Sequence, residues 1–107
     1  MEWIPDMKSV TPTEFAALGP DAVLIDVREP DEVAAASIPG ARVMPMSTLT
    51  EHLDELPDGT FYVICHAGGR SARVVNALEQ QGHDAINVLG GITQWEQEGL
   101  PVRRAPR

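Results

Sequence analysis

Short apolar runs that recur along the chain limit its fold more than any other feature of the sequence. The clearest runs cover residues 22–27, 61–65 and 85–88, each bounded by turn residues or charges, as strands buried on both faces are. Residues 41–44 indicate a further short strand, and residues 3–5 an edge strand, where proline is tolerated. Because helical patterns alternate with these runs, we predict an α/β fold with a central, mostly parallel five-stranded sheet and helices on both faces.

Helix signals lie between the predicted strands. Thr11 has the features of an N-cap, with Pro12 at the first helical position and Glu14 placed for a capping box, so a helix is expected from here to about Gly19. The other helices are expected over residues 47–56, where Ser47 is the candidate cap, 71–81 and 93–98.

Length and composition favour one domain. The 107 residues fit a single domain over 1–107, with a packed core at about 8–102 and a polar tail at 103–107 that is expected to fray. A net charge of -8 disfavours nucleic acid and anionic membranes as partners. With one cysteine, no export signal and no long apolar span, we expect a soluble, cytoplasmic monomer.

Cys65 lies where the apolar run 61–65 ends and a glycine-rich turn leads into the next helix. Ligands of open α/β sheets bind at the carboxyl ends of strands, and the backbone N–H groups of a loop at 66–71 would stabilise a thiolate there. Gly68 and Gly69 suit such a tight loop because glycine adopts backbone angles that other residues avoid. The alternative is a cysteine that only fills the core, and the adjoining Gly-Gly-Arg-Ser favours the reactive thiol.

Three blocks of the sequence resemble, in the same order, those of single-domain rhodaneses. The loop from Cys65 to Ser71, Cys-His-Ala-Gly-Gly-Arg-Ser, is similar to the family's Cys-x-x-Gly-x-Arg-Ser active-site loop. The other blocks are 26–32 with Ile-Pro-Gly-Ala at 38–41, and 87–91 with Trp95 and Gly-Leu-Pro-Val at 99–102. The resemblance implies a rhodanese-like fold over nearly the whole chain.

The resemblance also implies the activity of a thiosulfate sulfurtransferase. The Cys65 thiolate would take sulfane sulfur from a donor such as thiosulfate and pass it from a persulfide to cyanide or a cellular thiol. The loop that binds substrate and persulfide would consist of His66, Ala67, Gly68, Gly69, Arg70 and Ser71. No cofactor is implied, and the implied partners are small sulfur donors and thiol acceptors, or a protein in either role.

Charged residues near the loop are candidates for supporting roles. Arg70 either adds a cation at the loop mouth or clamps the loop to a carboxylate, and its planar fork favours the clamp. Asp26 is a candidate partner for the loop or helix, or else it caps the turn that follows it. Arg28 with Glu29 and Glu32 is interpreted as a structural ion-pair cluster rather than as a substrate site.

Other polar or aromatic residues have ordinary explanations beside a functional one. His66 is expected as an exposed loop side chain, with tuning of the Cys65 charge as the alternative. Ser71 is expected to be a helix N-cap, and the additional role considered for it is a hydrogen bond to the persulfide. Trp95 is expected to be a core residue. His52 and His83 have no matched ligand spacing, so no metal site is predicted.

Departures from the family pattern leave three other functions open. Ala36-Ser37 replaces the common Gly-His, Val33 replaces an aromatic, and His66-Ala67 offers no permanent cation, so thiosulfate is expected to be a poor substrate. This favours, as an alternative, a persulfide carrier that is loaded by a partner. A phosphatase or arsenate reductase needs Cys-x5-Arg, whereas Cys65 and Arg70 have the Cys-x4-Arg spacing of a smaller cradle. A purely structural domain requires that Cys65 be dispensable.

Overall fold

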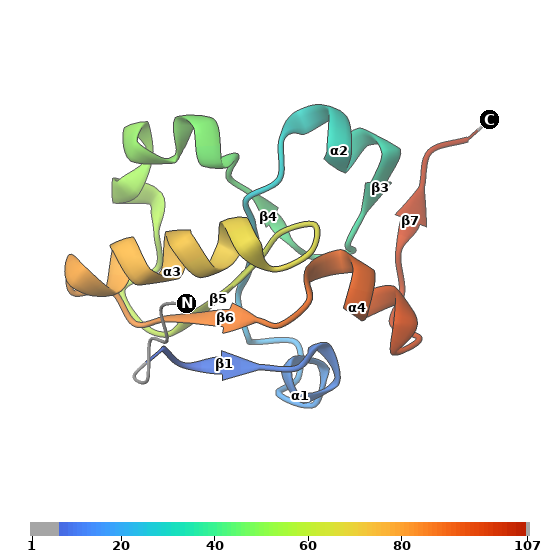
Figure 1. Cartoon of the computed structure of the whole chain (residues 1–107), viewed down its shortest axis with the longest axis horizontal. Helices are drawn as coiled ribbons and strands as arrows, with labels where there is room; N and C mark the ends of the chain where they lie inside the picture. The colour runs from blue at the N-terminus through green and yellow to red at the C-terminus, as the bar shows by residue number, and fades with distance from the viewer. Residues whose placement is uncertain (1–6, 107) are drawn as a thin grey trace.

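Five parallel strands form the central sheet of the computed structural model, which describes residues 7–106 (Figure 1). Each strand pairs in parallel with its neighbour. In spatial order the strands are β1 (Ser9–Val10), β6 (Ala85–Val88), β5 (Phe61–Ile64), β2 (Leu24–Asp26) and β4 (Arg42–Val43). The predicted fold class is confirmed. The edge strand predicted at 3–5 lies outside the described residues, and within residues 7–106 the edges of the sheet are β1 and β4.

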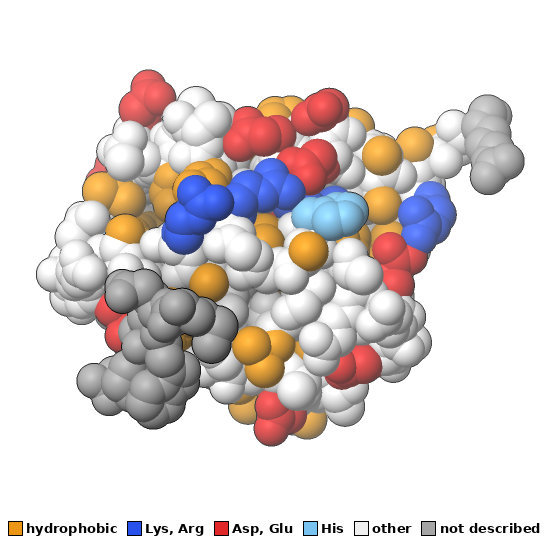
Figure 2. Space-filling model, viewed as in Figure 1, with side chains coloured by type: hydrophobic (Ala, Val, Ile, Leu, Met, Phe, Trp, Pro, Cys, Tyr) orange, Lys and Arg blue, Asp and Glu red, His pale blue; other side chains and the backbone are white. Residues whose placement is uncertain are grey.

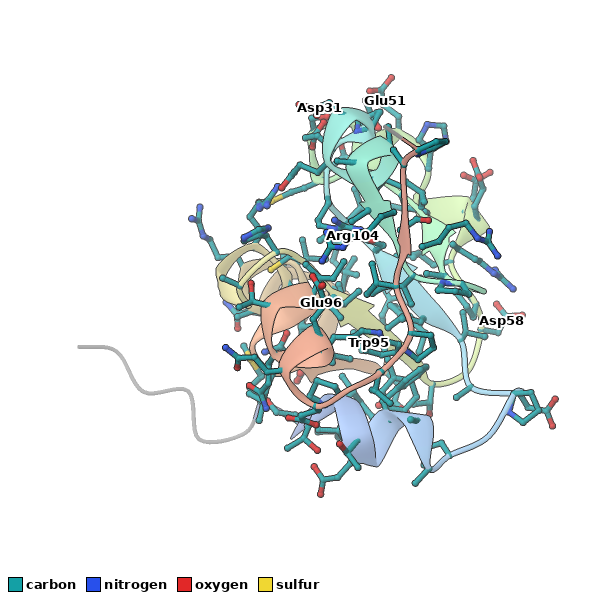
Figure 3. All side chains as sticks on the ribbon, turned by 90° about the vertical axis from the view of Figure 1, so that its right-hand side faces the viewer. Asp31, Glu51, Asp58, Trp95, Glu96 and Arg104 are labelled. Atoms are coloured by element: carbon teal, nitrogen blue, oxygen red, sulfur yellow. The ribbon has the colours of Figure 1, made fainter. Side chains whose placement is uncertain are left out.

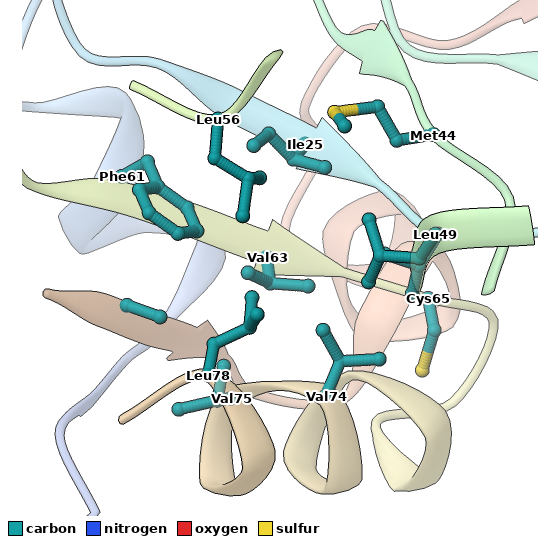
Figure 4. Packing of buried hydrophobic residues seen from close by; sticks show 12 residues of the cluster. Ile25, Met44, Leu49, Leu56, Phe61, Val63, Cys65, Val74, Val75 and Leu78 are labelled. Carbon is teal, nitrogen blue, oxygen red and sulfur yellow. The ribbon is translucent and has the colours of Figure 1, made fainter. Parts of the chain in front are cut away.

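Helices cover both faces of the sheet because neighbouring residues of a strand point to opposite sides. Ile25 and Val63 pack in one hydrophobic cluster with α3 (Gly69–Gln80), as Figure 4 shows. Leu24 and Ile64 pack in a second cluster with α1 (Pro12–Ala16) and α4 (Gly91–Gln97). Among residues 7–106, no helix is long and apolar enough to cross a membrane.

The start of α1 follows its sequence signal closely. The Thr11 hydroxyl accepts the Glu14 N–H at 3.1 Å, and the Glu14 carboxylate accepts the Thr11 N–H at 2.8 Å. This confirms the predicted capping box. The α-helical turn ends at Ala16, three residues before Gly19, where the chain turns with a positive φ of 91°.

The segment 47–56 is not the α-helix that the leucine spacing predicts. It forms two 3-10 turns, η1 (Met46–Glu51) and η2 (Leu53–Glu55), and η1 begins after Pro45 rather than after Ser47. The Ser47 hydroxyl donates instead to the Glu29 carboxylate at 2.7 Å, and the Ser47 N–H donates to the same carboxylate at 3.2 Å. Ser47 therefore binds Glu29, a residue distant in the sequence, instead of capping a helix.

A short helix, α2 (Pro30–Ala35), follows β2 along the chain and was not predicted. The sequence signal for this helix is Pro30, which stands at the first helical position. In the structure, the Glu32 carboxylate accepts the Glu29 N–H at 3.0 Å. This is the reciprocal half of a capping box, with glutamate in place of serine or threonine at the N-cap.

The C-terminal tail is held by a second, antiparallel pair of strands. β7 (Arg103–Arg104) pairs with β3 (Ala36–Ser37), and Arg104 forms an ion pair with Glu96 of α4 (Figure 3). The prediction that 103–107 frays is therefore wrong for Arg103 and Arg104, because backbone hydrogen bonds to a neighbouring segment do not depend on apolar side chains. Trp95 is buried as predicted, and its Nε1 donates to the Pro101 carbonyl at 2.9 Å.

Asp26 and Arg28 form a buried ion pair at the end of β2. Arg28 is 2% exposed, and its Nη2 lies 2.7 Å from Asp26 Oδ2 and 2.8 Å from the Ala36 carbonyl. Asp26 also accepts the Arg28 N–H at 3.1 Å, which is the turn-capping role. The predicted cluster with Glu29 and Glu32 is wrong in its partners, since Arg28 reaches the Glu32 carbonyl and not a glutamate carboxylate.

We predict that Arg28→Ala destabilises the protein by about 3–5 kcal/mol, because it leaves the buried Asp26 carboxylate without its partner. Urea unfolding monitored by circular dichroism measures this change. Arg42→Ala, at an exposed position of β4, serves as the matched control and should change stability by less than about 0.5 kcal/mol. Equal effects of the two substitutions would contradict the prediction.

Candidate active site

Cys65 follows the last residue of β5, at the carboxyl edge of the sheet, and its side chain is 1% exposed. Figure 4 shows its sulfur on the side of the sheet that carries α3, beside Leu49 and Val74. The sulfur lies at an open hollow of about 480 Å3. The other residues that line this hollow are Glu32, His66, Ala67, Gly69, Arg70 and Arg73.

Hydrogen-bond donors of the loop point at the Cys65 sulfur. The Gly68 N–H lies 3.0 Å from Sγ and the Ser71 hydroxyl 3.3 Å from it. Burial raises the pKa of the Cys65 thiol, but the hydrogen bonds from the Ser71 hydroxyl and from the backbone N–H groups of Ser71, Gly68 and Ala67 outweigh it. The net result is a pKa below the ordinary value for cysteine, which favours the nucleophilic thiolate.

The start of α4 fixes the orientation of the loop peptides. The Ile92 N–H donates to the Cys65 carbonyl at 2.9 Å, and the Thr93 N–H donates to the His66 carbonyl at 3.1 Å. In a trans peptide the N–H points away from the carbonyl of the same unit. With the His66 carbonyl turned toward α4, the Ala67 N–H is therefore turned toward the sulfur.

Two glycines allow this close contact. Gly91 has a φ of +58°, and a Cβ there would lie 2.4 Å from the His66 carbonyl oxygen. Gly68 has a φ of +105°, and a Cβ there would lie 3.2 Å from the Gly90 nitrogen. Gly69 has an ordinary φ and open space around it, so the prediction that its backbone needs glycine is wrong. Gly91 was missed as a site residue, although it lies in the sequence block 87–91.

Ser71 is not the N-cap of α3, because the helix already begins at Gly69 and Gly68 occupies the N-cap. Its buried hydroxyl lies 2.7 Å from Asn87 Oδ1, 3.2 Å from the Gly68 carbonyl and 3.3 Å from Cys65 Sγ. One hydroxyl hydrogen serves one of these acceptors at a time. Asn87 was also missed as a site residue, although a polar side chain in the buried strand 85–88 was a usable signal.

Arg70 makes the two-bond clamp to a carboxylate that its planar fork predicts. Its Nη1 and Nη2 each lie 2.7 Å from an oxygen of Glu32 on α2, so the pair ties the start of α3 to α2. The Arg70 guanidinium lowers the pKa of Glu32 to about 2, and Glu32 in turn raises the pKa of Arg70. Within residues 7–106, Asp26 and Arg28 bind each other, and Arg28 also donates to the carbonyls of Glu32 on α2 and Ala36 on β3 rather than to the loop.

The mouth of the hollow is basic on one side and acidic on the other. Figure 2 shows blue and pale blue side chains gathered over the start of α3, with red side chains next to them. His66 and Arg73 are exposed, as expected for His66. In the described part of the chain, no group of three His, Cys, Asp or Glu side chains is arranged to hold a metal ion.

Comparison with known proteins agrees with this geometry. The profile of the rhodanese-like domain matches residues 11–98. The chain belongs to the rhodanese-like family. A curated relative named sulfurtransferase, from Allochromatium vinosum, is 37% identical over 84 residues, which cover 77% of this chain and 78% of the relative.

Solved structures of rhodanese-like proteins have the same fold. The rhodanese-related protein from Thermoplasma volcanium is 35% identical, has a TM-score of 0.84, and covers 90% of this chain and 97% of its own. A rhodanese-like domain protein from Staphylococcus aureus is 38% identical with a TM-score of 0.81, over 91% of this chain and 99% of that one. The three ordered sequence blocks therefore identified the family correctly.

We predict that Ser71→Ala raises the pKa of the Cys65 thiol, because the substitution removes the hydroxyl donor to the sulfur. The rate of alkylation by iodoacetamide, followed against pH by intact-protein mass, reports this pKa. The midpoint for the wild type should lie below that of a cysteine peptide, and the midpoint for Ser71→Ala above that of the wild type. An unchanged midpoint in Ser71→Ala would contradict the role of this hydrogen bond.

We predict that Glu32→Gln destabilises the protein by about 1 kcal/mol at pH 7, the upper range for partly exposed ion pairs. Folding lowers the pKa of Glu32 to about 2 from an unfolded value of about 4.3, so the folded protein binds this proton more weakly. The stabilisation is therefore present above pH 4.3 and lost as the pH falls toward 2. Urea unfolding of both proteins at pH 7, 5 and 3 should show a difference that shrinks only below pH 5.

Proposed function

We propose that this rhodanese-like protein is a sulfurtransferase in which Cys65 carries sulfane sulfur as a persulfide. The observation that supports this most is a buried sulfur whose pKa is lowered by loop N–H groups and that opens onto a hollow of about 480 Å3. A cysteine that only fills the core has no need of converging donors. The family relationship to a named sulfurtransferase supports the same class of reaction.

In the first half-reaction, the Cys65 thiolate attacks the outer sulfur of a donor such as thiosulfate. A new S–S bond forms to Cys65, the S–S bond of thiosulfate breaks, and sulfite leaves with the electron pair. The terminal sulfur of the persulfide carries negative charge, and the loop N–H groups and the N-terminus of α3 offer positive potential to it. The reaction needs no oxidant and no cofactor.

In the second half-reaction, an acceptor nucleophile attacks the terminal sulfur. The Cys65–S bond breaks and its electron pair returns to Cys65 as thiolate, so the enzyme is regenerated. Cyanide serves as an assay acceptor and a thiol as the cellular one. A reducing compartment such as the cytoplasm keeps Cys65 free for this cycle.

The alternative of a carrier that is loaded by a persulfide donor rests on the charge of the loop. His66 and Ala67 supply no permanent cation, and the charge of Arg70 is neutralised by Glu32. A thiosulfate dianion therefore gains little from the loop side chains. A persulfide of a small thiol carries less charge, and we expect it to load Cys65 faster than thiosulfate does.

The proposal is tested by intact-protein mass after reduced protein is incubated with thiosulfate or, separately, with cysteine persulfide. Wild type should gain one sulfur that a reductant removes, whereas Cys65→Ser should gain none. Loading by the persulfide alone would establish the carrier. The absence of an added sulfur with both donors, in a folded protein whose Cys65 alkylates normally, would overturn both versions of the proposal.

A further inference from the structure

An apolar groove of about 170 Å3 lies beside the hollow that contains Cys65. It runs between the two 3-10 turns, η1 and η2, and one face of α3. Its apolar lining comes from Met46, Leu49, Leu53, Val74, Ala77 and Leu78. Leu49 and Val74 belong to the same hydrophobic cluster as Cys65 and lie beside it in Figure 4. Two residues of the groove wall thus pack in the same cluster as Cys65, and the groove meets the hollow at Arg73.

Arg73 borders both the hollow and the groove. The other arginines near the site are engaged, Arg28 by Asp26 and Arg70 by Glu32. Arg73 is exposed, and within residues 7–106 it has no carboxylate within ion-pair distance. Since Glu32 and Arg70 cancel, the remaining charges on the wall of the hollow are the Cys65 thiolate and the Arg73 guanidinium. The protein as a whole carries a net charge of -8 and repels anions, so this local cation stands out.

We propose that the hollow, Arg73 and the groove together form the binding site of the sulfur acceptor, and that this acceptor is a thiol with two further parts. A carboxylate near its sulfur pairs with Arg73, and a short apolar chain beyond the carboxylate lies in the groove. The inference rests on the proposed sulfurtransferase activity and names the acceptor class of that activity.

The hollow, Arg73 and the groove lie in this order on the protein, so the thiol, the carboxylate and the apolar chain of the acceptor must be arranged to match. The Cys65 hollow comes first, the Arg73 side chain stands at the border, and the apolar walls follow. The volume of the groove is below the range of about 300–1,000 Å3 that drug-sized ligands occupy, so it fits a chain of a few carbons. N-acylated cysteines have this arrangement, with the thiol on a short arm, the carboxylate beside it and the acyl chain opposite.

The transfer itself balances without another reactant. The acceptor thiolate attacks the terminal sulfur of the Cys65 persulfide, and a new S–S bond forms on the acceptor. The bond between Cys65 and the transferred sulfur breaks, and its electron pair stays on Cys65. The products are the Cys65 thiolate and the acceptor persulfide.

The test measures how fast sulfur-loaded protein loses its extra sulfur to N-acetyl-, N-butanoyl- and N-hexanoyl-L-cysteine, and to the methyl ester of the last. Intact-protein mass follows the reaction, and rates are compared per thiolate. Because a partly buried methylene contributes a fraction of its full transfer free energy, the rate at low concentration should rise about tenfold from the acetyl to the hexanoyl compound. The ester should react about fivefold more slowly than the acid, as for loss of an exposed ion pair.

Two substitutions separate the two contacts. Arg73→Gln should remove the difference between the acid and its ester, and Ala77→Phe, which fills the groove from α3, should remove the dependence on chain length. The controls are Arg42→Gln and Ala17→Phe, at exposed positions that line neither cavity, and both should behave as wild type. Rates in the wild type that are independent of chain length and of the carboxylate would overturn the inference and leave the sulfurtransferase proposal intact.

A binding measurement covers the case in which no donor loads Cys65 and the proposed function itself fails. N-hexanoyl-L-serine has oxygen in place of sulfur and cannot react. Calorimetric titration of the wild type with it should show saturable binding that Arg73→Gln and Ala77→Phe each weaken about fivefold or more. Absence of binding to the wild type, or variants that bind as tightly as the wild type, would overturn the inference.

Discussion

The contact between the first N–H groups of α4 and the carbonyls of Cys65 and His66 is the interaction on which the site depends. It turns the loop peptides so that their N–H groups face the sulfur, and it requires the absence of a side chain at Gly91. The helix is in turn held by the core, because Ile92 and Trp95 pack against Phe15 and Ile64 below the sheet. The orientation of the loop peptides around Cys65 thus depends on a helix that contributes no lining residue to the hollow.

Burial and hydrogen bonding act in opposite directions on Cys65, and the balance explains why the loop has its shape. An isolated thiolate with 1% exposure is costly, and only donors that converge from several directions offset that cost. Backbone N–H groups suit this task because they add positive potential without adding a mobile charge. The two arginine pairs beside the loop hold elements together instead: Arg28, paired with Asp26 of β2, also binds the Ala36 carbonyl of β3, and Arg70 joins α2 to α3. Because Arg28 and Arg70 are paired with carboxylates, Arg73 is left as a cation that faces solvent at the site.

Much of the fold could be predicted because its signals are local. Strands buried on both faces need continuous apolar runs, and the start of α1 needs the side chains of Thr11 and Glu14, so both are visible in a few residues. The predictions failed where a distant segment decided the structure. Ser47 caps no helix because Glu29 binds its hydroxyl and N–H, and Arg103 and Arg104 form a strand because β3 offers them a backbone partner. The carboxylate that clamps Arg70 lies 38 residues away, and spacing alone did not single out Glu32 among the acidic residues.

By itself, the sequence determined the α/β class, the family, and the position of one cysteine at the end of a buried strand before a glycine-rich turn. These follow from short-range pattern, since apolar runs, caps and turn residues act on neighbours a few positions away. Only the tertiary structure decided which groups surround that cysteine: the α4 N–H groups behind the loop, Asn87 beside Ser71, and the groove that Arg73 joins to the hollow. The physical reason is that the pKa of a group, the charge balance of a site and the volume of a pocket all depend on distances between atoms. Those distances are set by how strands and helices from distant parts of the sequence pack together.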